Sequence, residues 1–453
     1  MTETAPSPLT IDIGSAEIRR AVLASIIGNG MEWFDFIVIG SFIHFISIAF
    51  FPAASPGVSI LRTLGAFAAG FVVRPFGGIL LGLYADRAGR RKALALLIVV
   101  MAFGTLLVGI TPSYRQIGIA APVIFVFARV LQGLSVGGEF ASAASMLVEY
   151  APAGKRMFYG SFEMASQGFA LLVGSLLAFS LARYLPHAAM RSWGWRVPFI
   201  LGAFIGPVGY YIRHHVAESP VLRRLQEHHD LMPRDRFAPY FARHKAALLC
   251  GIGVIVVGAA LNFLWHGYMP LYVTRHLHLP LYVALFGNSA SGLIAVIGYP
   301  LAGKLADRVG AYRVFFPVVI AFSIAAYPLY HFVVSDPTIP RLVTAQIIAS
   351  LFLTLMSGPH PGMLTDLFPA RVRATGVAIS YNVAVTCFGG LAPLAVTWLI
   401  QVTKSDFVPA GFQIGAAVIS LIVVAIALPR ARAALGWADG SGIDAAMVRV
   451  GEP

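Results

Sequence analysis

Two arginines stand inside long apolar runs of this sequence, where a positive charge needs a partner. Arg74 lies in the apolar run that begins near position 59, and Arg129 lies about eleven residues into the run that begins near position 118. The planar guanidinium group donates two parallel hydrogen bonds to a carboxylate. We therefore expect Arg74, Arg129 and the nearby Gln132 to bind a carboxylate ligand. A structural ion pair between helices is the alternative interpretation of each arginine.

Acidic side chains occupy the same kind of apolar run and indicate proton chemistry. Asn29 and Glu32 are three residues apart and share a helix face, and Asp35 follows one turn further on. Glu139 follows two glycines in the run that contains Arg129. A ligand that captures an arginine would release a neighbouring acid to bind a proton. We expect Glu32, Asp35 and Glu139 to carry a coupling proton, and Asn29 to contact the ligand.

The apolar runs of the later part of the chain contain hydrogen-bonding side chains rather than lysine or arginine near their middles. Such groups suit the recognition of hydroxyls and carboxylates. For the two histidines the alternative is a packing role, and for the Tyr-Asn pair it is an interhelical contact. The expected ligand-contacting residues here are Asn262, His266, Tyr268, His360, Tyr381 and Asn382.

The composition places these residues in a lipid bilayer. Of 453 residues, 58% are hydrophobic and 12% are charged, whereas soluble domains are roughly 25% charged. Lipid cannot satisfy open backbone groups, so spanning segments of about 20 apolar residues must be helical. We predict an all-α integral membrane fold with twelve transmembrane helices. The predicted helices cover residues 21–50, 59–84, 92–112, 118–148, 157–183, 195–213, 246–273, 281–303, 311–333, 339–366, 374–402 and 407–429.

The same pattern excludes several classes of function. The net charge of +13 reflects basic residues on cytoplasmic loops rather than a nucleic-acid partner. The apolar runs contain no nucleophile–base spacing and no set of metal ligands, so neither an enzyme, a metal nor an organic cofactor is expected. Four histidines between positions 214 and 229 could suggest a metal, but their spacing fits a solvated linker better.

The distribution of lysine and arginine orients the chain. With the N-terminus inside, 23 of the 33 basic residues lie in cytoplasmic segments and eight lie on the opposite side. The positive-inside rule therefore predicts cytoplasmic termini, and we expect a multi-pass protein of a bacterial inner membrane. The predicted organisation is a tail (1–20), a six-helix bundle (21–213), a cytoplasmic linker (214–245), a second six-helix bundle (246–429) and a tail (430–453).

A polar segment that occurs twice shows that the chain consists of two related halves. Residues 82–92 recur 221 positions later as residues 303–313, with Gly, Asp, Arg and Gly at the same offsets. Each copy follows the second helix of its half, on the predicted cytoplasmic side. We expect a gate there, in which an Asp meets a helix N-terminus or an arginine of the other bundle. The expected gate residues are Gly82, Asp86, Arg87, Gly89, Arg90, Asp307 and Arg308.

These motifs resemble those of a known family. Residues 82–92 resemble the cytoplasmic signature of the major facilitator superfamily, and residues 129–133 (Arg-Val-Leu-Gln-Gly) resemble its fourth-helix motif. Within it, residues 28–36, 70–78 and 132–139 are similar to the metabolite:proton symporter group. The resemblance implies two six-helix bundles, alternating access and proton symport, with Asp35 and Arg129 in the positions of an ion pair known from sugar:proton symporters.

The resemblance also limits the substrate. Residues 193–213 and 368–390 look most like the citrate and tricarballylate branch, so uptake of a di- or tricarboxylate with protons is expected, in a monomer whose partners are substrate, protons and lipid. Another carboxylate stays open: 2-oxoglutarate, shikimate, proline or betaine. A betaine would need an aromatic cage, for which Trp33, Phe34, Trp265 and Tyr268 are available. A transporter-like sensor is a more remote alternative. The second gate copy lacks the Arg-Arg-Lys run of the first, so its latch is expected to be weaker.

Overall fold

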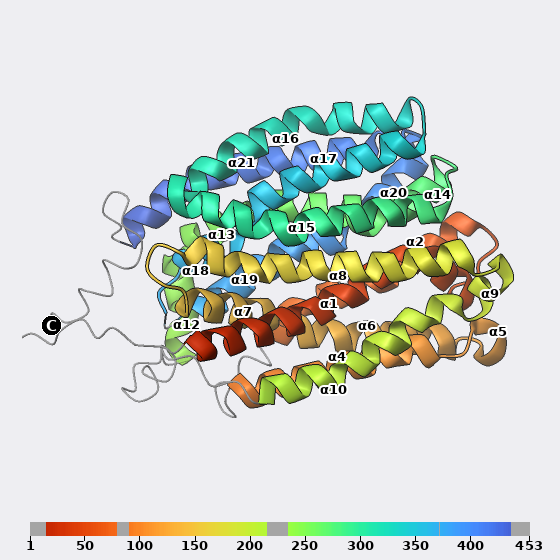
Figure 1. Cartoon of the computed structure of the whole chain (residues 1–453), viewed down its shortest axis with the longest axis horizontal. Helices are drawn as coiled ribbons and strands as arrows, with labels where there is room; N and C mark the ends of the chain where they lie inside the picture. Colours follow the sequence, from red (N-terminus) through yellow and green to blue (C-terminus); the bar gives the residue numbers. More distant parts are fainter. Residues whose placement is uncertain (1–14, 79–89, 215–233, 371, 436–453) are drawn as a thin grey trace, which may run out of the picture.

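The computed structural model describes residues 15–78, 90–214, 234–370 and 372–435, and this part of the chain is helical, without a strand (Figure 1). The prediction of an all-α fold is confirmed. The first half contains α1 (Ser15–Phe50), α2 (Pro56–Val72), α4 (Arg90–Ile110), α5 (Tyr114–Ile117), α6 (Ala120–Val136), α7 (Glu139–Glu149), α8 (Arg156–Tyr184), α9 (His187–Ser192), the short 3-10 helix η1 (Gly194–Arg196) and α10 (Val197–His214).

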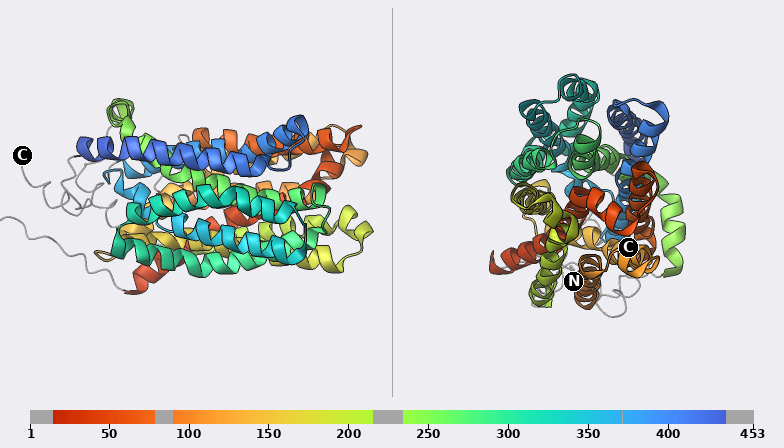
Figure 2. Two further views of the ribbon diagram at one scale, coloured as in Figure 1. Left: turned by 90° about the horizontal axis from the view of Figure 1, so that it is seen from above. Right: turned by 90° about the vertical axis from the view of Figure 1, so that its right-hand side faces the viewer.

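Within the predicted linker, residues 214–245, the chain forms α12 (Arg234–Arg243). The second half contains α13 (Lys245–Asn262), the π-helix η2 (Phe263–Tyr268), α14 (Met269–Arg275), α15 (Leu281–Val309), α16 (Ala311–Val334), α17 (Ile339–Ser357), α18 (His360–Asp366), α19 (Arg373–Val385), the π-helix η3 (Thr386–Gly390), α20 (Ala392–Thr403) and α21 (Val408–Ala434). Residues 215–233 of the linker lie outside the described residues, and α12 lies across one end of the bundle (Figures 1 and 2).

Apolar helices of membrane-spanning length account for most of the predicted segments. Ten helical runs of the described residues are long and apolar enough to cross a bilayer, and Leu96–Ile110 is a shorter apolar run. Large apolar side chains on the outer surface remain exposed, among them Ile119 and Ile324, each 71% exposed. That surface suits contact with lipid rather than water. The chain is a multi-pass membrane protein.

Several predicted helices are not continuous. The predicted helix 118–148 divides at Gly137 and Gly138 into α6 and α7, and the predicted helix 339–366 divides before His360 into α17 and α18. The predicted helices 246–273 and 374–402 each contain a π-helical turn, η2 or η3. Such turns are uncommon and occur often at functional sites.

Small residues allow the helices that position the site to approach closely. A Cβ atom added to Gly133 of α6 would collide with the backbone oxygen of Gly70 in α2. Between the halves, a Cβ on Gly168 of α8 would lie 2.7 Å from Ala295 Cβ in α15. The α8 and α15 helices therefore run side by side and join the two halves (Figure 1). Seen along the bundle, the helices of the two halves gather on opposite sides (Figure 2).

Candidate functional site

Two buried ion pairs connect helices α1, α2 and α6 of the first half. A guanidinium nitrogen of Arg129 lies 2.9 Å from Asp35 Oδ2, and a guanidinium nitrogen of Arg74, just beyond the C-terminal end of α2, lies 3.2 Å from Glu32 Oε1. Both arginines are fully buried. Charges removed from water require such partners, because an isolated buried ion is very costly. The four side chains carry no net charge when all are ionised.

The Arg129 pair belongs to a larger hydrogen-bond network. Arg129 donates to Gln132 Oε1, Gln132 Nε2 donates to Thr105 Oγ1 at 2.9 Å, and Thr105 Oγ1 donates to Asp35 Oδ1 at 2.9 Å. The structure thus places Gln132 behind the arginine as its acceptor. Arg129 and Asp35 are held from several sides, whereas the Arg74–Glu32 contact is longer.

Aromatic rings separate both arginines from the centre of the molecule. The guanidinium carbon of Arg74 lies 4.5 Å from the ring centroid of Phe36 and 4.3 Å from that of Phe71. Arg129 lies 5.1 Å from the rings of Phe36 and Phe67. Cation–π contacts of this kind stabilise a desolvated cation. One ring, that of Phe36, thus contacts both cations.

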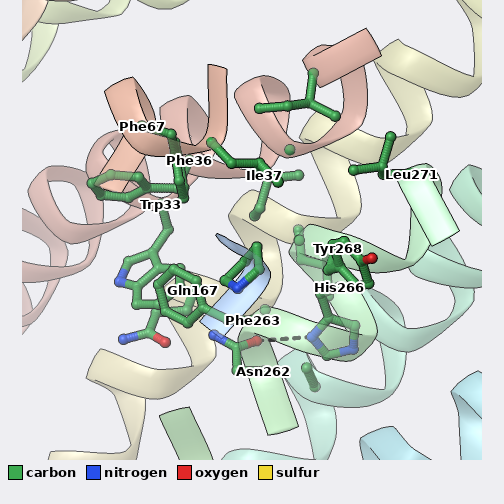
Figure 3. Close-up of a pocket in the computed structure, with 18 of the residues that line it drawn as sticks. Trp33, Phe36, Ile37, Phe67, Gln167, Asn262, Phe263, His266, Tyr268 and Leu271 are labelled. Atoms are coloured by element: carbon green, nitrogen blue, oxygen red, sulfur yellow. Dashed lines mark hydrogen bonds between the residues drawn. The ribbon is translucent and has the colours of Figure 1, made fainter. Parts of the chain in front are cut away.

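Phe36 and Phe67 also line a central cavity between the two halves (Figure 3). The space free of atoms is about 700 Å³, which includes open solvent at its mouth. A second recess adjoins it and shares Trp33, Gln167 and Asn262 with it. Aromatic rings form much of the wall: Trp33, Phe36, Phe67, Phe263, Tyr268 and Tyr299. The described lining contains no Lys, Arg, Asp or Glu.

Some buried polar atoms of the lining have no partner in the described part of the protein. They include Trp33 Nε1, which is a donor, and His266 Nε2, whereas the Gln167 side chain forms a hydrogen bond with Tyr381. His266 Nδ1 lies 2.8 Å from Asn262 Oδ1 (Figure 3). Unsatisfied buried polar groups cost about 1–3 kcal/mol each, so a ligand that satisfies them gains binding energy from them.

The predicted ligand residues are distributed over three environments. Asn262, His266 and Tyr268 line the cavity, and His360 and Tyr381 line the adjoining recess. Asn29 instead connects α1 to α8, donating to the Glu163 carbonyl at 2.9 Å and to Ser166 Oγ at 2.7 Å. Asn382 donates to the Gly137 carbonyl at 2.6 Å, where α6 ends, and so connects the halves. Arg74, Arg129 and Gln132 lie behind the aromatic wall.

Two further predicted residues have packing partners. The ring of Tyr381 stacks on Phe140 with their centroids 3.7 Å apart, and Thr397 Oγ1 donates to the Tyr268 hydroxyl at 3.2 Å. Glu139 is buried in the first turn of α7, where the helix dipole favours a carboxylate.

The sequence interpretation omitted Gln167 and Tyr299, which line both parts of the cavity. It also considered Trp33 only for its ring and not for its donor. Gln167 is a polar residue in the apolar run of residues 157–183, and that signal could have identified it.

The second gate copy forms a contact between the halves at the end of the bundle where α1 begins and α21 ends (Figure 1). Asp307, in the last turn of α15, accepts hydrogen bonds from the backbone N–H groups of Met157 and Phe158, each 2.9 Å long. It therefore caps the N-terminus of α8 in the other half. Arg308 is exposed. Gly82, Asp86, Arg87 and Gly89 lie outside the described residues, and of Arg90 only the backbone, at the start of α4, is described.

Two ion pairs flank the Asp307 cap and are related by the internal repeat. Arg373 contacts Glu149 at 2.8 Å, and Arg156 contacts Asp366 at 3.0 Å. Both pairs join a residue at the end of one helix to the start of a helix in the opposite half. These ion pairs and the Asp307 cap hold the two halves together at this end of the bundle.

Comparisons with known proteins agree with this architecture. A family model described as "Sugar (and other) transporter" matches residues 21–232, and one described as "Major Facilitator Superfamily" matches residues 268–442. Among similar solved structures is the proton:xylose symporter XylE bound to 6-bromo-6-deoxy-D-glucose, with a TM-score of 0.73 at 19% identity, covering 95% of this chain and 97% of that chain. A structure of XylE from E. coli in a partially occluded inward-open conformation has a TM-score of 0.71 at 17% identity, covering 91% and 99%.

Curated relatives of two kinds are similar over most of the chain. A citrate-proton symporter of Klebsiella pneumoniae is 31% identical over 96% of this chain and 97% of its own length. A citrate-proton symporter of Salmonella typhi is 32% identical over 90% and 94%. The glycine betaine/proline/ectoine/pipecolic acid transporter OusA of Dickeya dadantii is 32% identical over 92% of this chain and 85% of its own length. The relatives thus agree on transport and differ in the named substrate.

Proposed function

The chain belongs to the major facilitator superfamily of transporters, and we propose that it takes up a small carboxylate together with protons by alternating access. One observation carries this proposal. Two buried Arg–carboxylate pairs contact aromatic rings of a central cavity, and an unpartnered donor of that cavity, Trp33 Nε1, suits a carboxylate. The setting is a bacterial inner membrane, with both termini in the cytoplasm.

The buried pairs provide a route for coupling. Asp35 is the central proton carrier, because protonating it removes the partner of Arg129 and weakens the contact between α1 and α6. Glu32 can act in the same way through Arg74, whose remaining guanidinium nitrogens have no hydrogen-bond partner among the described residues. A substrate carboxylate that reaches Arg74 when Phe36 moves would replace Glu32, which then accepts a proton.

The chemistry of the cavity favours one class of carboxylate. The described lining carries no Lys or Arg, and the nearest arginines are offset by Glu32 and Asp35. Desolvating three negative charges there would be costly. Aromatic rings do stabilise an ammonium group. A zwitterion such as proline, one of the substrates named for OusA, therefore fits this cavity with less desolvation cost than citrate.

Citrate or tricarballylate is the second candidate, because the motifs of residues 193–213 and 368–390 resemble that branch and two relatives are citrate-proton symporters. For a tricarboxylate, Arg74 must turn toward the cavity and supply positive charge. Substitution of Arg74 by Gln should then abolish citrate uptake while leaving uptake of a zwitterion measurable.

Uptake into proteoliposomes with an imposed pH gradient tests the proposal. Radiolabelled proline, glycine betaine, citrate and 2-oxoglutarate would be compared with liposomes that contain the Asp35→Asn protein. The proposal predicts accumulation of at least one carboxylate by the wild type, driven by the gradient, and none by Asp35→Asn. Equal accumulation by both proteins would refute the coupling role, and the absence of any carboxylate uptake would refute the transport assignment.

A further inference from the structure

His266 lies in the cavity wall, and its contact with Asn262 determines which of its ring nitrogens carries the proton. Its side chain is buried, with 4% exposed, and its Nδ1 lies 2.8 Å from Asn262 Oδ1. An amide oxygen only accepts hydrogen bonds, so Nδ1 carries the hydrogen. The described cavity lining includes no Asp or Glu to offset an imidazolium charge. The ring is therefore neutral, and its Nε2 is an acceptor.

That acceptor has no partner in the described protein. His266 Nε2 is buried and makes no hydrogen bond, and His266 lines the central cavity (Figure 3). A carboxylate cannot bind to a bare nitrogen lone pair, because both groups are acceptors. A hydroxyl or N–H group of a substrate would satisfy it.

The surrounding helices fix the position of this ring. His266 lies in the π-helix η2, and its backbone carbonyl accepts a hydrogen bond from Asn288 Nδ2 at 2.8 Å. Gln346 Nε2 in turn donates to Asn288 Oδ1 at 2.8 Å. Both amide side chains are fully buried. The network holds the backbone turn that presents His266, as a positioning shell does for a binding group.

The opposite side of the cavity has the opposite hydrogen-bonding character. Trp33 Nε1 of α1, in the first half, is a buried donor without a partner in the described structure. A donor suits the carboxylate end of a substrate. In the main cavity, a buried unpartnered donor of the first half thus accompanies the unpartnered acceptor His266 Nε2 of the second.

We propose that His266 Nε2 selects carboxylates that also carry a hydrogen-bond donor, either a hydroxyl or an N–H group, and rejects analogues in which that donor is absent or methylated. The inference rests on the proposed carboxylate transport. It ranks proline above its N,N-dimethyl derivative, and citrate above tricarballylate, which differs from citrate by one hydroxyl group. A buried acceptor left unpaired lowers affinity roughly tenfold to a hundredfold.

Competition in proteoliposomes tests the selection. The wild type, His266→Phe and Asn262→Leu would be compared with His331→Phe, in which an exposed histidine outside the cavity is replaced. We expect the wild type and His331→Phe to prefer the donor-bearing member of each pair at least tenfold. His266→Phe should lose this preference while keeping uptake of the analogue without the donor, and Asn262→Leu should reduce it.

A second measurement keeps the inference separate from the transport assignment. In protein with 15N-labelled histidine, comparison with His266→Phe identifies the His266 imidazole signals among those of the twelve histidines. Protonated Nδ1 and bare Nε2 are expected. A proton on Nε2, or an undiminished preference in His266→Phe, would overturn the inference while the transport assignment stands. Failure of every carboxylate to be taken up, with the expected 15N signals, would overturn the transport assignment and the substrate preference built on it.

Discussion

Replacing Asp307 by Ala should weaken the contact between the two halves at the N-terminus of α8. The carboxylate accepts hydrogen bonds from the Met157 and Phe158 amides at the start of α8, each 2.9 Å long. These first-turn amides have no acceptor within their own helix. The substitution therefore removes their protection and one contact between the halves, without altering the cavity.

The size of the effect follows from the contacts. A hydrogen bond to a charged group contributes about 1.5–3 kcal/mol, and because Asp307 is only partly buried we take about 2 kcal/mol for the two together. Since about 1.4 kcal/mol is a tenfold change, the equilibrium for opening this contact should shift by roughly 30-fold.

Amide hydrogen exchange measures that shift directly. Peptides that contain Met157 and Phe158 should exchange about 30-fold faster in Asp307→Ala, following the opening free energy. The matched control is Asp336→Ala, because the exposed Asp336 carboxylate contacts the partly exposed Arg341 at 3.3 Å within the second half. Equal protection of these amides in the wild type and in Asp307→Ala would refute the capping role.

Three further substitutions and conditions have defined outcomes. Arg129→Ala should abolish uptake and lower stability by about 3–5 kcal/mol, because Asp35 is left as a buried charge without its cation; wild-type uptake by this variant would contradict the role of the pair. Gly133→Ala should lower the melting temperature, since its Cβ collides with the α2 backbone and overpacking costs about 1–3 kcal/mol. Gly138→Ala, whose Cβ meets nothing within 4 Å, should melt like the wild type, and equal melting of both variants would count against close α2–α6 packing. Burial lowers the pKa of His276, which lies just beyond the end of α14. Its contribution to stability is therefore complete above its unfolded-state pKa of about 6.5 and is lost as pH falls through its folded-state pKa. Thermal melts between pH 8 and 5 should show this loss in the wild type and a smaller one in His276→Gln, and parallel curves would contradict it.

The all-helical fold could be predicted from residue types and motif spacing, and the family resemblance implied the Asp35–Arg129 pair, whereas the Arg74–Glu32 pair was not predicted. An arginine and an aspartate in apolar runs had to find each other, because neither charge is tolerated alone in lipid. The structure shows that pairing for Arg129 and Asp35. The aromatic rings over the two arginines could not be predicted from the sequence, because the position of the Phe36 ring over both cations depends on how α1 packs against α2 and α6.

Only part of the cavity lining could be predicted from the sequence. His266 was recognisable as a polar residue in an apolar run, but its bare Nε2 depends on the contact with Asn262 and on the π-helical turn. That turn relies on Asn288 and Gln346, which are 22 and 80 residues away along the chain. Long-range hydrogen bonds of this kind override local helix propensity. For the same reason the break at Gly137 became visible only in the folded chain.

Substrate-driven proton movement in proteoliposomes tests the central claim most directly. With a pH indicator inside the vesicles and no imposed gradient, addition of a transported carboxylate outside should acidify the interior in step with its uptake. The same addition to Asp35→Asn vesicles should produce no proton movement. Carboxylate uptake by the wild type without acidification, or acidification that persists in Asp35→Asn, would contradict coupling through the buried Asp35–Arg129 pair.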